Sequence, residues 1–217
     1  MAPTSYIKVK NGATGAVRSI LTAAGRHGGD NGYSSLVVRN KRNDVDTCQF
    51  VIDYSNPDVA ALVDKDQIEV IRSDPAQAIA EYTLFDGLFR DDIVEYKNGL
   101  YTFTARAFGY NHFLSWRNIA WPANVTNRTK FTSQKAETIL KNLVNYNIGA
   151  TALASNGRIV DGALTGFTIE ADGANGNTLS LAVSNENLLD ALKKIVPKAG
   201  GDFAVVRTGA TSFQFKW

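Results

Sequence analysis

Apolar and polar residues alternate with a period of two through most of the first hundred residues, as in strands with one buried face. The run "SYIKVKNGATGAV" contains an Asn11-Gly12 turn signal, and "YSSLVVRNKRNDVDTCQFVID" contains two strands around a polar turn. The pattern continues through "QIEVIRS" and "AEYTLFDGLFRDDIVEYKNGLYTFTARAF", in which Asn98-Gly99 is the next turn signal. Short strands joined by tight turns predict an antiparallel barrel or sandwich over residues 1–108, with Gly87 at a bulge or a barrel corner.

After Gly109 the apolar residues follow a helical period instead. In "FTSQKAETILKNLVNYNIG" they fall on one stripe, and Thr132 or Ser133 is the expected N-cap of the helix. A glycine-rich stretch follows, in which we expect a loop with one or two short strands.

A second helix is predicted in "SNENLLDALKKIVPKAGG", whose leucines, isoleucine and valine line one face. Ser184 or Asn185 is the expected N-cap, and Pro197 with Gly200-Gly201 is expected to end the helix. Together the two helices and the stretch between them predict an α/β insert over residues 109–200.

The last segment, residues 201–217, returns to a period of two. "DFAVVRTGATSFQFKW" predicts a β-hairpin with Phe213, Phe215 and Trp217 on one face. Because an unpaired aromatic edge strand invites aggregation, we expect this hairpin to pair with the barrel, with another subunit, or with a second barrel in a longer protein. The order of segments predicts an α+β, mainly β fold: an antiparallel barrel interrupted by a small α/β insert.

Composition excludes several classes of protein. The 23 basic and 21 acidic residues give a net charge of +2 without blocks of one sign, which is not the pattern of a nucleic-acid-binding surface. The single cysteine, Cys48, has apolar neighbours and is expected in the core. No stretch has the ~18 apolar residues of a membrane span, so we expect no membrane anchor.

Residues capable of catalysis are scattered. His27 and His112 accompany no Gly-x-Ser-x-Gly motif, and we expect His112 to pack at a domain junction. On a strand, Asp91 and Asp92 point to opposite faces and cannot form the carboxylate pair of a glycoside hydrolase. Two isolated histidines and one cysteine cannot supply a clustered metal site. We therefore expect no enzymatic activity, no cofactor and no metal.

Four stretches share an order and spacing of motifs. "LVVRNKRNDVDTCQFVIDYSNPDVAALVDKDQIEVIRSD" has a strand pair, a short link and a "D-x-I-x-V-x-R" strand. "LFDGLFRDDIVEYKNGLYTFTARAFGYNHFLSWRNIAW" has an "F-x-G-x-F" strand, an "A-x-G" step and an "L-x-x-R-x-I" continuation. "TSQKAETILKNLVNYNIG" and "NENLLDALKKIVPKAGGDFAVVRTGATSFQF" add a helix and an "N-L-L-x-A-L" helix that runs into a strand. In this arrangement, residues 33–216 resemble the baseplate hub or tail-tip proteins of siphophages and related contractile tails.

The resemblance implies a tail-tube-like barrel whose copies form a ring, generally a homotrimer, at the distal end of the tail tube. It implies a virion structural protein of the phage tail tip, made in the bacterial cytoplasm, without an active site of its own. The implied partners are further copies of the chain, a tail-tube or distal-tail protein, the tape-measure protein, and tail fibre or spike proteins. DNA is implied only in passage through the lumen. Family hubs are often longer, so the chain is expected to be a compact variant or the N-terminal part of a longer hub.

The stretch "YTFTARAFGYNHFLSWRNIAW", residues 101–121, combines aromatic residues with arginines, which are enriched at obligate interfaces. We interpret it as the seam between barrel and insert. The residues expected at this seam or at a subunit interface are Arg106, Trp116, Arg117, Trp121, Phe213, Phe215 and Trp217.

Two alternative functions stay open from the sequence. A hexameric tail-tube or distal-tail ring protein would have the same β-rich architecture. A carbohydrate-binding β-module would instead use Trp116 and Trp121 as a stacking platform for sugar rings.

Overall fold

The computed structural model describes residues 4–23, 32–120, 128–154 and 162–217. The chain divides into two compact units. Residues 1–41 and 45–109 form the first, which we call the barrel unit, and residues 42–44 and 110–217 form the second, the helical unit. The predicted α+β, mainly β fold class is confirmed.

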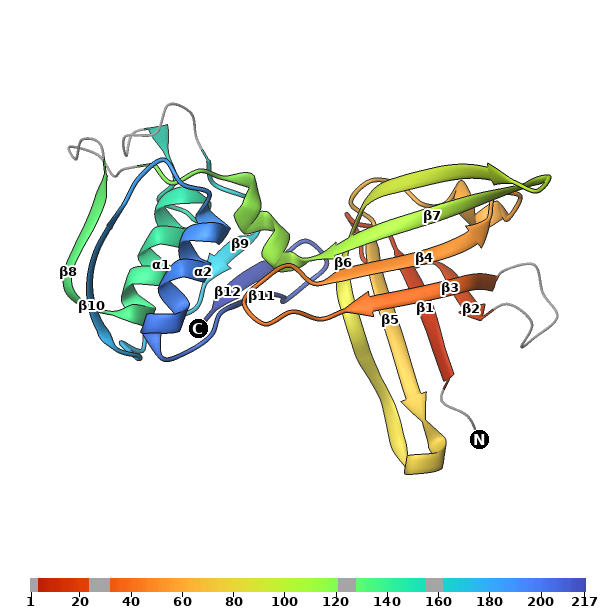
Figure 1. The fold of residues 1–217 in the computed structure, drawn as a ribbon, viewed down its shortest axis with the longest axis horizontal. Helices are drawn as coiled ribbons and strands as arrows, with labels where there is room; N and C mark the ends of the chain where they lie inside the picture. Colours follow the sequence, from red (N-terminus) through yellow and green to blue (C-terminus); the bar gives the residue numbers. More distant parts are fainter. Residues whose placement is uncertain (1–3, 24–31, 121–127, 155–161) are drawn as a thin grey trace. The chain divides into compact units, whose positions relative to one another are not determined.

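Seven strands close the barrel in the order β1-β2-β3-β4-β7-β6-β5 (Figure 1). Neighbouring strands are antiparallel except β2 and β3, which are parallel and pair only through Thr22 with Gly32 and Ala23 with Tyr33. The strands are β1 Thr4–Lys10, β2 Val17–Ala23, β3 Gly32–Arg39, β4 Thr47–Asp53, β5 Gln67–Asp74, β6 Ile79–Lys97 and β7 Leu100–Gly109. Short 3-10 turns, η1 (Pro57–Val59) and η2 (Pro75–Gln77), precede β5 and β6.

The barrel core consists of the inward side chains of this alternating pattern. Phe50, Ile52, Ile68 and Val70 are fully buried, and Cys48 lies among them with 1% of its surface exposed. Burial disfavours the thiolate and raises the pKa of Cys48 to about 12. The expected place of the cysteine in the core is confirmed.

Strand β6 is shared between two walls of the barrel. It pairs with β5 up to Leu88 and with β7 from Gly87 onward, and the ladder skips one residue on each side of this corner, Leu84 and Arg90. A Cβ on Gly87 would lie 2.4 Å from the carbonyl oxygen of Phe108. Only glycine therefore fits where the two walls meet.

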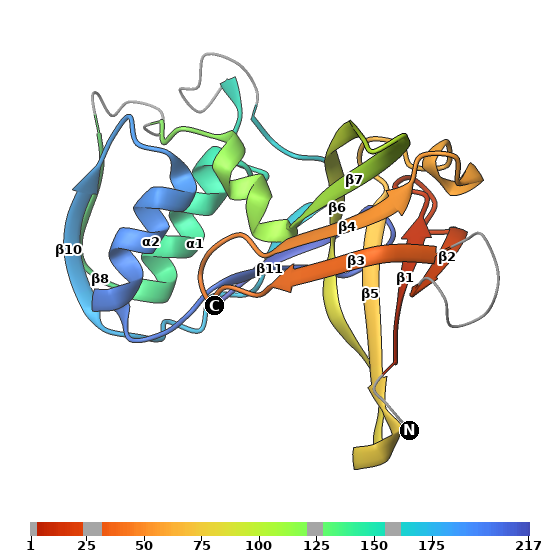
Figure 2. The same cartoon turned by 45° about the vertical axis from the view of Figure 1, so that its right-hand side comes forward.

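The helical unit packs two helices with two small sheets (Figure 2). A 3-10 helix, η3 (Tyr110–Trp116), opens the unit, and helices α1 and α2 contact each other. The elements are α1 Ala136–Asn147, α2 Leu188–Ala199, β8 Thr129–Lys135 paired with β10 Thr178–Val183, and the sheet β11 Ala204–Arg207, β12 Phe213–Lys216 and β9 Phe167–Ile169. None of the helices in the described ranges is long and apolar enough to cross a membrane.

The C-terminal hairpin pairs within the helical unit, whereas the sequence suggested the barrel, another subunit or a second barrel. Strand β12 is the middle strand of its sheet, antiparallel to β11 and parallel to β9. Phe213 and Phe215 are 8% and 0% exposed. Strand β9, from the glycine-rich segment, pairs with the open edge of β12, and the rings of Phe213 and Phe215 pack against Phe113 and Phe203.

Helix α1 begins later than predicted. Thr132 and Ser133 belong to β8, which pairs with β10 through Lys135, so Lys135 takes the N-cap position. Thr132 and Ser133 lie at an irregularity of this ladder, where the backbone N–H of Ser133 donates to the Ser180 hydroxyl at 2.9 Å, and neither residue caps the helix.

Helix α2 is capped by Asn187 instead of Ser184 or Asn185. The Asn187 side chain accepts the backbone N–H of Leu189 and donates to the carbonyl of Ser115 at 2.8 Å. Pro197 lies inside the last turn and does not end the helix, which stops at a left-handed glycine, Gly200.

Three residues between β3 and β4, Arg42–Asp44, belong to the helical unit. The Asn43 side chain accepts the backbone N–H of Phe203 at 2.8 Å and donates to the Asp202 carboxylate at 2.7 Å. Lys193 forms an ion pair with Asp44 at 2.9 Å, and Arg42 forms one with Asp202. The helical unit is therefore built from two segments of the chain.

A buried ion pair fixes the first turns of α1. Glu137 and Lys141 are 2% and 4% exposed, and the Lys141 ammonium donates to the Glu137 carboxylate and, at 2.7 Å, to the carbonyl of Ala171. The carboxylate also accepts the backbone N–H groups of Gly173 at 3.0 Å and Asn175 at 2.8 Å. Burial by itself raises the pKa of Glu137, but these donors outweigh it and lower the pKa to about 2.

We expect Glu137→Gln to lower the free energy of unfolding by about 3–5 kcal/mol, because it leaves Lys141 buried without its counter-charge. Since the pKa of Glu137 is lowered on folding, its stabilisation is complete above the ordinary value of 4.5 and is lost as pH falls toward about 2. Urea unfolding at pH 7 and pH 3 measures both effects. Glu95→Gln, on an exposed strand, is the matched control, and equal stabilities of the two variants would contradict the prediction.

We expect native Cys48 to react with a maleimide about 100-fold more slowly, or slower still, than in guanidinium-unfolded protein, because the thiol is buried and its pKa is raised. Mass spectrometry of timed samples measures the labelled fraction. Equal labelling rates in the two states would place the thiol at the surface.

Candidate interaction surface

Exposed apolar side chains gather on the barrel unit. In the part of the chain that the structure describes, no large apolar residue of the helical unit is exposed to this degree. Contiguous exposed apolar surface marks interaction sites in soluble proteins. The exposed residues are Val17, Ile20, Val37, Tyr54, Val63, Ile79, Tyr82, Val94, Tyr96, Leu100 and Tyr101.

The hairpin of β6 and β7 continues beyond the barrel core. Val94 lies opposite the buried Phe103, and Tyr96 lies opposite Tyr101, so all four side chains share the core-side face. Phe103 is 5% exposed, whereas Val94, Tyr96 and Tyr101 are 45%, 64% and 55% exposed. The same face that is buried in the barrel is thus open to solvent at the end of the hairpin.

Three tyrosines form a row across the end of this sheet. The backbone N–H of Tyr54, just after β4, donates to the carbonyl of Tyr101 at 3.1 Å. The ring centroids of Tyr54 and Tyr101 are 6.1 Å apart, and those of Tyr96 and Tyr101 are 4.7 Å apart. Tyrosine offers a large contact area with a polar tip, and it is enriched at protein interfaces. We call Tyr54, Tyr96 and Tyr101 the tyrosine row.

Two stretches of strand are paired on one side only among the described residues. Beyond its two contacts with β2, β3 pairs with β4 alone over residues 34–39. Strand β6 pairs with β7 alone over residues 91–97. We call these stretches the free edges, because each presents backbone N–H and C=O groups that another strand can bind.

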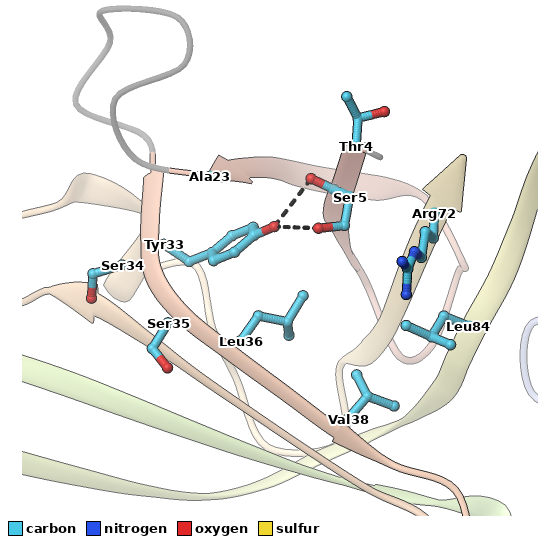
Figure 3. A pocket seen from close by; sticks show the side chains of 10 residues that line it. All are labelled: Thr4, Ser5, Ala23, Tyr33, Ser34, Ser35, Leu36, Val38, Arg72 and Leu84. Carbon is cyan, nitrogen blue, oxygen red and sulfur yellow. Dashed lines mark hydrogen bonds between the residues drawn. The ribbon is translucent and has the colours of Figure 1, made fainter. Parts of the chain in front are cut away.

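A cavity of about 490 Å³ lies beside the free edge of β3 (Figure 3). The Tyr33 hydroxyl lies 2.7 Å from the Ser5 hydroxyl on β1, and the Asn40 amide donates to the carbonyl of Leu84 on β6 at 3.2 Å. These bonds tie both ends of β3 to the opposite wall. Between them the lining is formed by Thr4, Ser5, Ala23, Tyr33, Ser34, Ser35, Leu36, Val38, Arg72 and Leu84.

Charged groups near the free edges differ in how they are paired. Asp91 lies opposite Arg106 on β7 and forms an ion pair with it at 3.2 Å. Asp92 lies on the other face, opposite the buried Ala105, so the predicted divergence of the two carboxylates is confirmed. The side chains of Asp92 and Arg72 make no hydrogen bond or ion pair with another described residue. Within the described ranges, no three His, Cys, Asp or Glu residues group closely enough to hold a metal ion.

No protein-family model matches the chain, and no curated protein matches its sequence. The chain is similar to solved structures that include a tail protein from Neisseria meningitidis MC58, with a TM-score of 0.49 and 9% identity over 99% of this chain and 50% of that one. They also include the 43 kDa tail protein of prophage MuSo2 from Shewanella oneidensis, with a TM-score of 0.47 and 10% identity over 98% and 52% of the two chains. The chain spans about half the length of these two proteins.

The sequence-predicted interface residues occupy different environments. Arg106 lies on the outer face of β7 in its ion pair with Asp91. In the helical unit, Phe113 contacts both Trp116 and Phe213, with ring centroids 4.8 and 4.7 Å away. Phe213 therefore belongs to a buried aromatic cluster of the helical unit.

The remaining predicted residues are partly or fully buried, or they lie outside the described ranges. Arg117 donates to the carbonyls of Trp116 at 3.3 Å and Gly162 at 3.5 Å, and Phe215 is fully buried. Trp217 packs against Gly201, where a Cβ would lie 2.2 Å from its ring. Trp121 lies outside the described residues.

His112 is partly buried in η3 and has a structural environment. Its ring nitrogen Nδ1 lies 3.2 Å from the Ser115 hydroxyl, and its ring meets Trp116 edge-on at 5.8 Å. The predicted role of His112 as a packed residue agrees with these contacts.

The sequence interpretation included Tyr101 in the stretch 101–121, but it did not single out Tyr54, Tyr96 or Arg72. The alternation in "DIVEYKNGLYTF" around its Asn98-Gly99 turn assigns Tyr96 and Tyr101 to one face, and this was the available signal.

We expect Tyr96→Ser combined with Tyr101→Ser to lower the binding of a hydrophobic dye to the native protein, because the pair supplies much of the exposed aromatic surface. The free energy of unfolding should change by less than about 1 kcal/mol, since both rings are more than half exposed. Dye fluorescence and urea unfolding measure the two effects. Tyr110→Ser, at a buried position, is the control and should destabilise the protein strongly.

Proposed function

We propose that the chain is a structural component of a phage tail tip, a baseplate hub that forms a ring at the distal end of the tail tube. In this role it connects the tube to tail-tip, fibre or spike proteins and performs no catalysis. The order of sequence segments, which resembles that of hub proteins, supports this proposal. The main structural support is the opposite direction of the two strands that form the free edges.

The free edges belong to one four-stranded sheet, β3-β4-β7-β6, in which every neighbouring pair is antiparallel. With an even number of alternating strands, the two edge strands run in opposite directions. A second copy related by rotation alone then brings its β3 antiparallel to the β6 of the first copy. The sheet continues from copy to copy as an antiparallel ladder, and a rotation that closes gives a ring.

The two free edges are also matched in length and character. Residues 34–39 and 91–97 each span about 20 Å at the ~3.3 Å rise per residue of a strand. Val37 and Val94 expose apolar side chains on them, at 42% and 45%. Pairing the edges would cover this apolar surface and satisfy the open backbone groups, which is how oligomers remove exposed strand edges.

The proposed assembly is a homotrimer in the virion tail tip, made in the bacterial cytoplasm. Its proposed partners are a tail-tube or distal-tail protein on one side, with the tape-measure protein, and fibre or spike proteins on the other. DNA passes through the lumen without being bound. The same edge pairing with six copies would give the alternative, a tail-tube or distal-tail ring.

We expect the protein to form closed rings of three copies in native mass spectrometry and negative-stain microscopy, alone or on a tail-tube protein. Val37→Lys should abolish these rings, because it places a charge in the middle of the joined edges. Ile79→Lys, an exposed residue of β6 outside the free edge, is the matched control and should assemble normally.

Rings of six copies would favour the tube or distal-tail alternative. A protein that stays monomeric at ~100 μM and forms no ring on a tail-tube protein would overturn the proposal, since obligate interfaces of standard size hold at lower concentrations.

A further inference from the structure

We propose that the cavity beside β3 is a socket for the β6 side chains of a neighbouring copy of this chain, and that Asp92 of the neighbour pairs there with Arg72. This inference rests on the ring arrangement proposed above and adds the residues that determine its register.

The argument begins with the faces of the two strands. Leu36 and Val38 on β3 lie opposite Phe50 and Cys48, so they point to the core side of the sheet, toward the cavity. Rotation keeps the core side of one copy continuous with the core side of the next. The residues of the neighbour's β6 that enter the cavity are therefore those on its own core-side face: Asp92, Val94 and Tyr96.

Arg72 is the charged group that this cavity offers. On β5 it follows the buried Ile68 and Val70 at a period of two, and it lies opposite Ser5 on β1, so it extends the inward face of that wall. Figure 3 shows its guanidinium directed toward the space beside Leu84 and Val38. A guanidinium between apolar side chains binds a carboxylate more strongly than a neutral acceptor.

Asp92 is the carboxylate that fits this guanidinium. It is exposed on the core-side face, where alternation calls for an apolar residue, and its cross-strand neighbour is the fully buried Ala105. The other acidic residues of the free edge, Asp91 and Glu95, lie on the opposite face, and Asp91 is already paired with Arg106. An inward-pointing charge on an edge strand opposes pairing with another strand. Pairing at this edge therefore requires a basic partner for Asp92, and Arg72 is the one that the cavity offers.

The apolar residues set the register. When Val94 lies beside Leu36, antiparallel pairing places Asp92 beside Val38, next to Arg72 and Leu84. The same register places Ile93 beside Val37 on the outer face, so apolar residues meet on both faces.

Charge reversal tests the pair. We expect Asp92→Arg and Arg72→Asp each to weaken assembly at least about 10-fold in Kd, because each leaves like charges facing one another in the cavity. Asp92→Arg combined with Arg72→Asp should restore assembly toward the wild-type level. Glu95→Arg, a reversal on the same strand but the opposite face, is the control and should assemble as the wild type does. Sedimentation velocity measures Kd, and circular dichroism confirms that each variant is folded.

Cross-linking tests the register independently. Val37→Cys combined with Ile93→Cys should give disulfide-linked ladders under mild oxidation, since Cys48 is buried and does not compete. Val38→Cys combined with Ile93→Cys places the two thiols on opposite faces and should give none.

The outcomes separate this inference from the proposed function. Rings in the wild type, with both single reversals assembling normally or with no rescue by the double reversal, would overturn the socket and leave the ring intact. Ladders from the Val38 pair and none from the Val37 pair would overturn the register. An absence of any assembly by the wild type would overturn both proposals.

Discussion

The barrel depends on a single strand, β6, that belongs to two of its walls. Because β6 pairs first with β5 and then with β7, it must bend sharply, and the bend lies at Gly87, where a side chain would collide with the carbonyl of Phe108. The skipped residues Leu84 and Arg90 release the ladder on either side of the bend. Each of the two walls can then extend beyond the end of the other. The side chains on the inward face of the extended part are exposed to solvent instead of being buried.

Two consequences follow for the surface. Where the β6 and β7 hairpin outruns the core, an inward-facing row becomes an exposed row of tyrosines. Where the wall of β1 and β5 extends past β3, the inward-facing Arg72 lines an open cavity. In the proposed ring, a second copy of the same surface would cover what the first leaves open.

Much of the fold follows from local patterns in the sequence. Alternation identified the barrel strands and the opposite faces of Asp91 and Asp92, and the apolar stripes identified both helices. Long-range pairing was not predictable in this way. Strand β9 is only three residues long and shows no periodicity, so no local pattern indicated that it would pair with β12, the strand of Phe213 and Phe215. The solvent exposure of Tyr96 was not predictable either, because alternation assigns the residue to a face of the strand but does not show where the opposite wall of the barrel ends.

Asn43 links two distant segments of the sequence within the helical unit. Its side chain holds Asp202 and the backbone of Phe203, yet it lies in the sequence between two barrel strands. Recombination that replaced residues 110–217 with those of a relative would separate these partners unless the short segment 42–44 came with them. The helical unit is therefore not a portable cassette, and we expect Asn43 and Asp202 to change together as such proteins diverge.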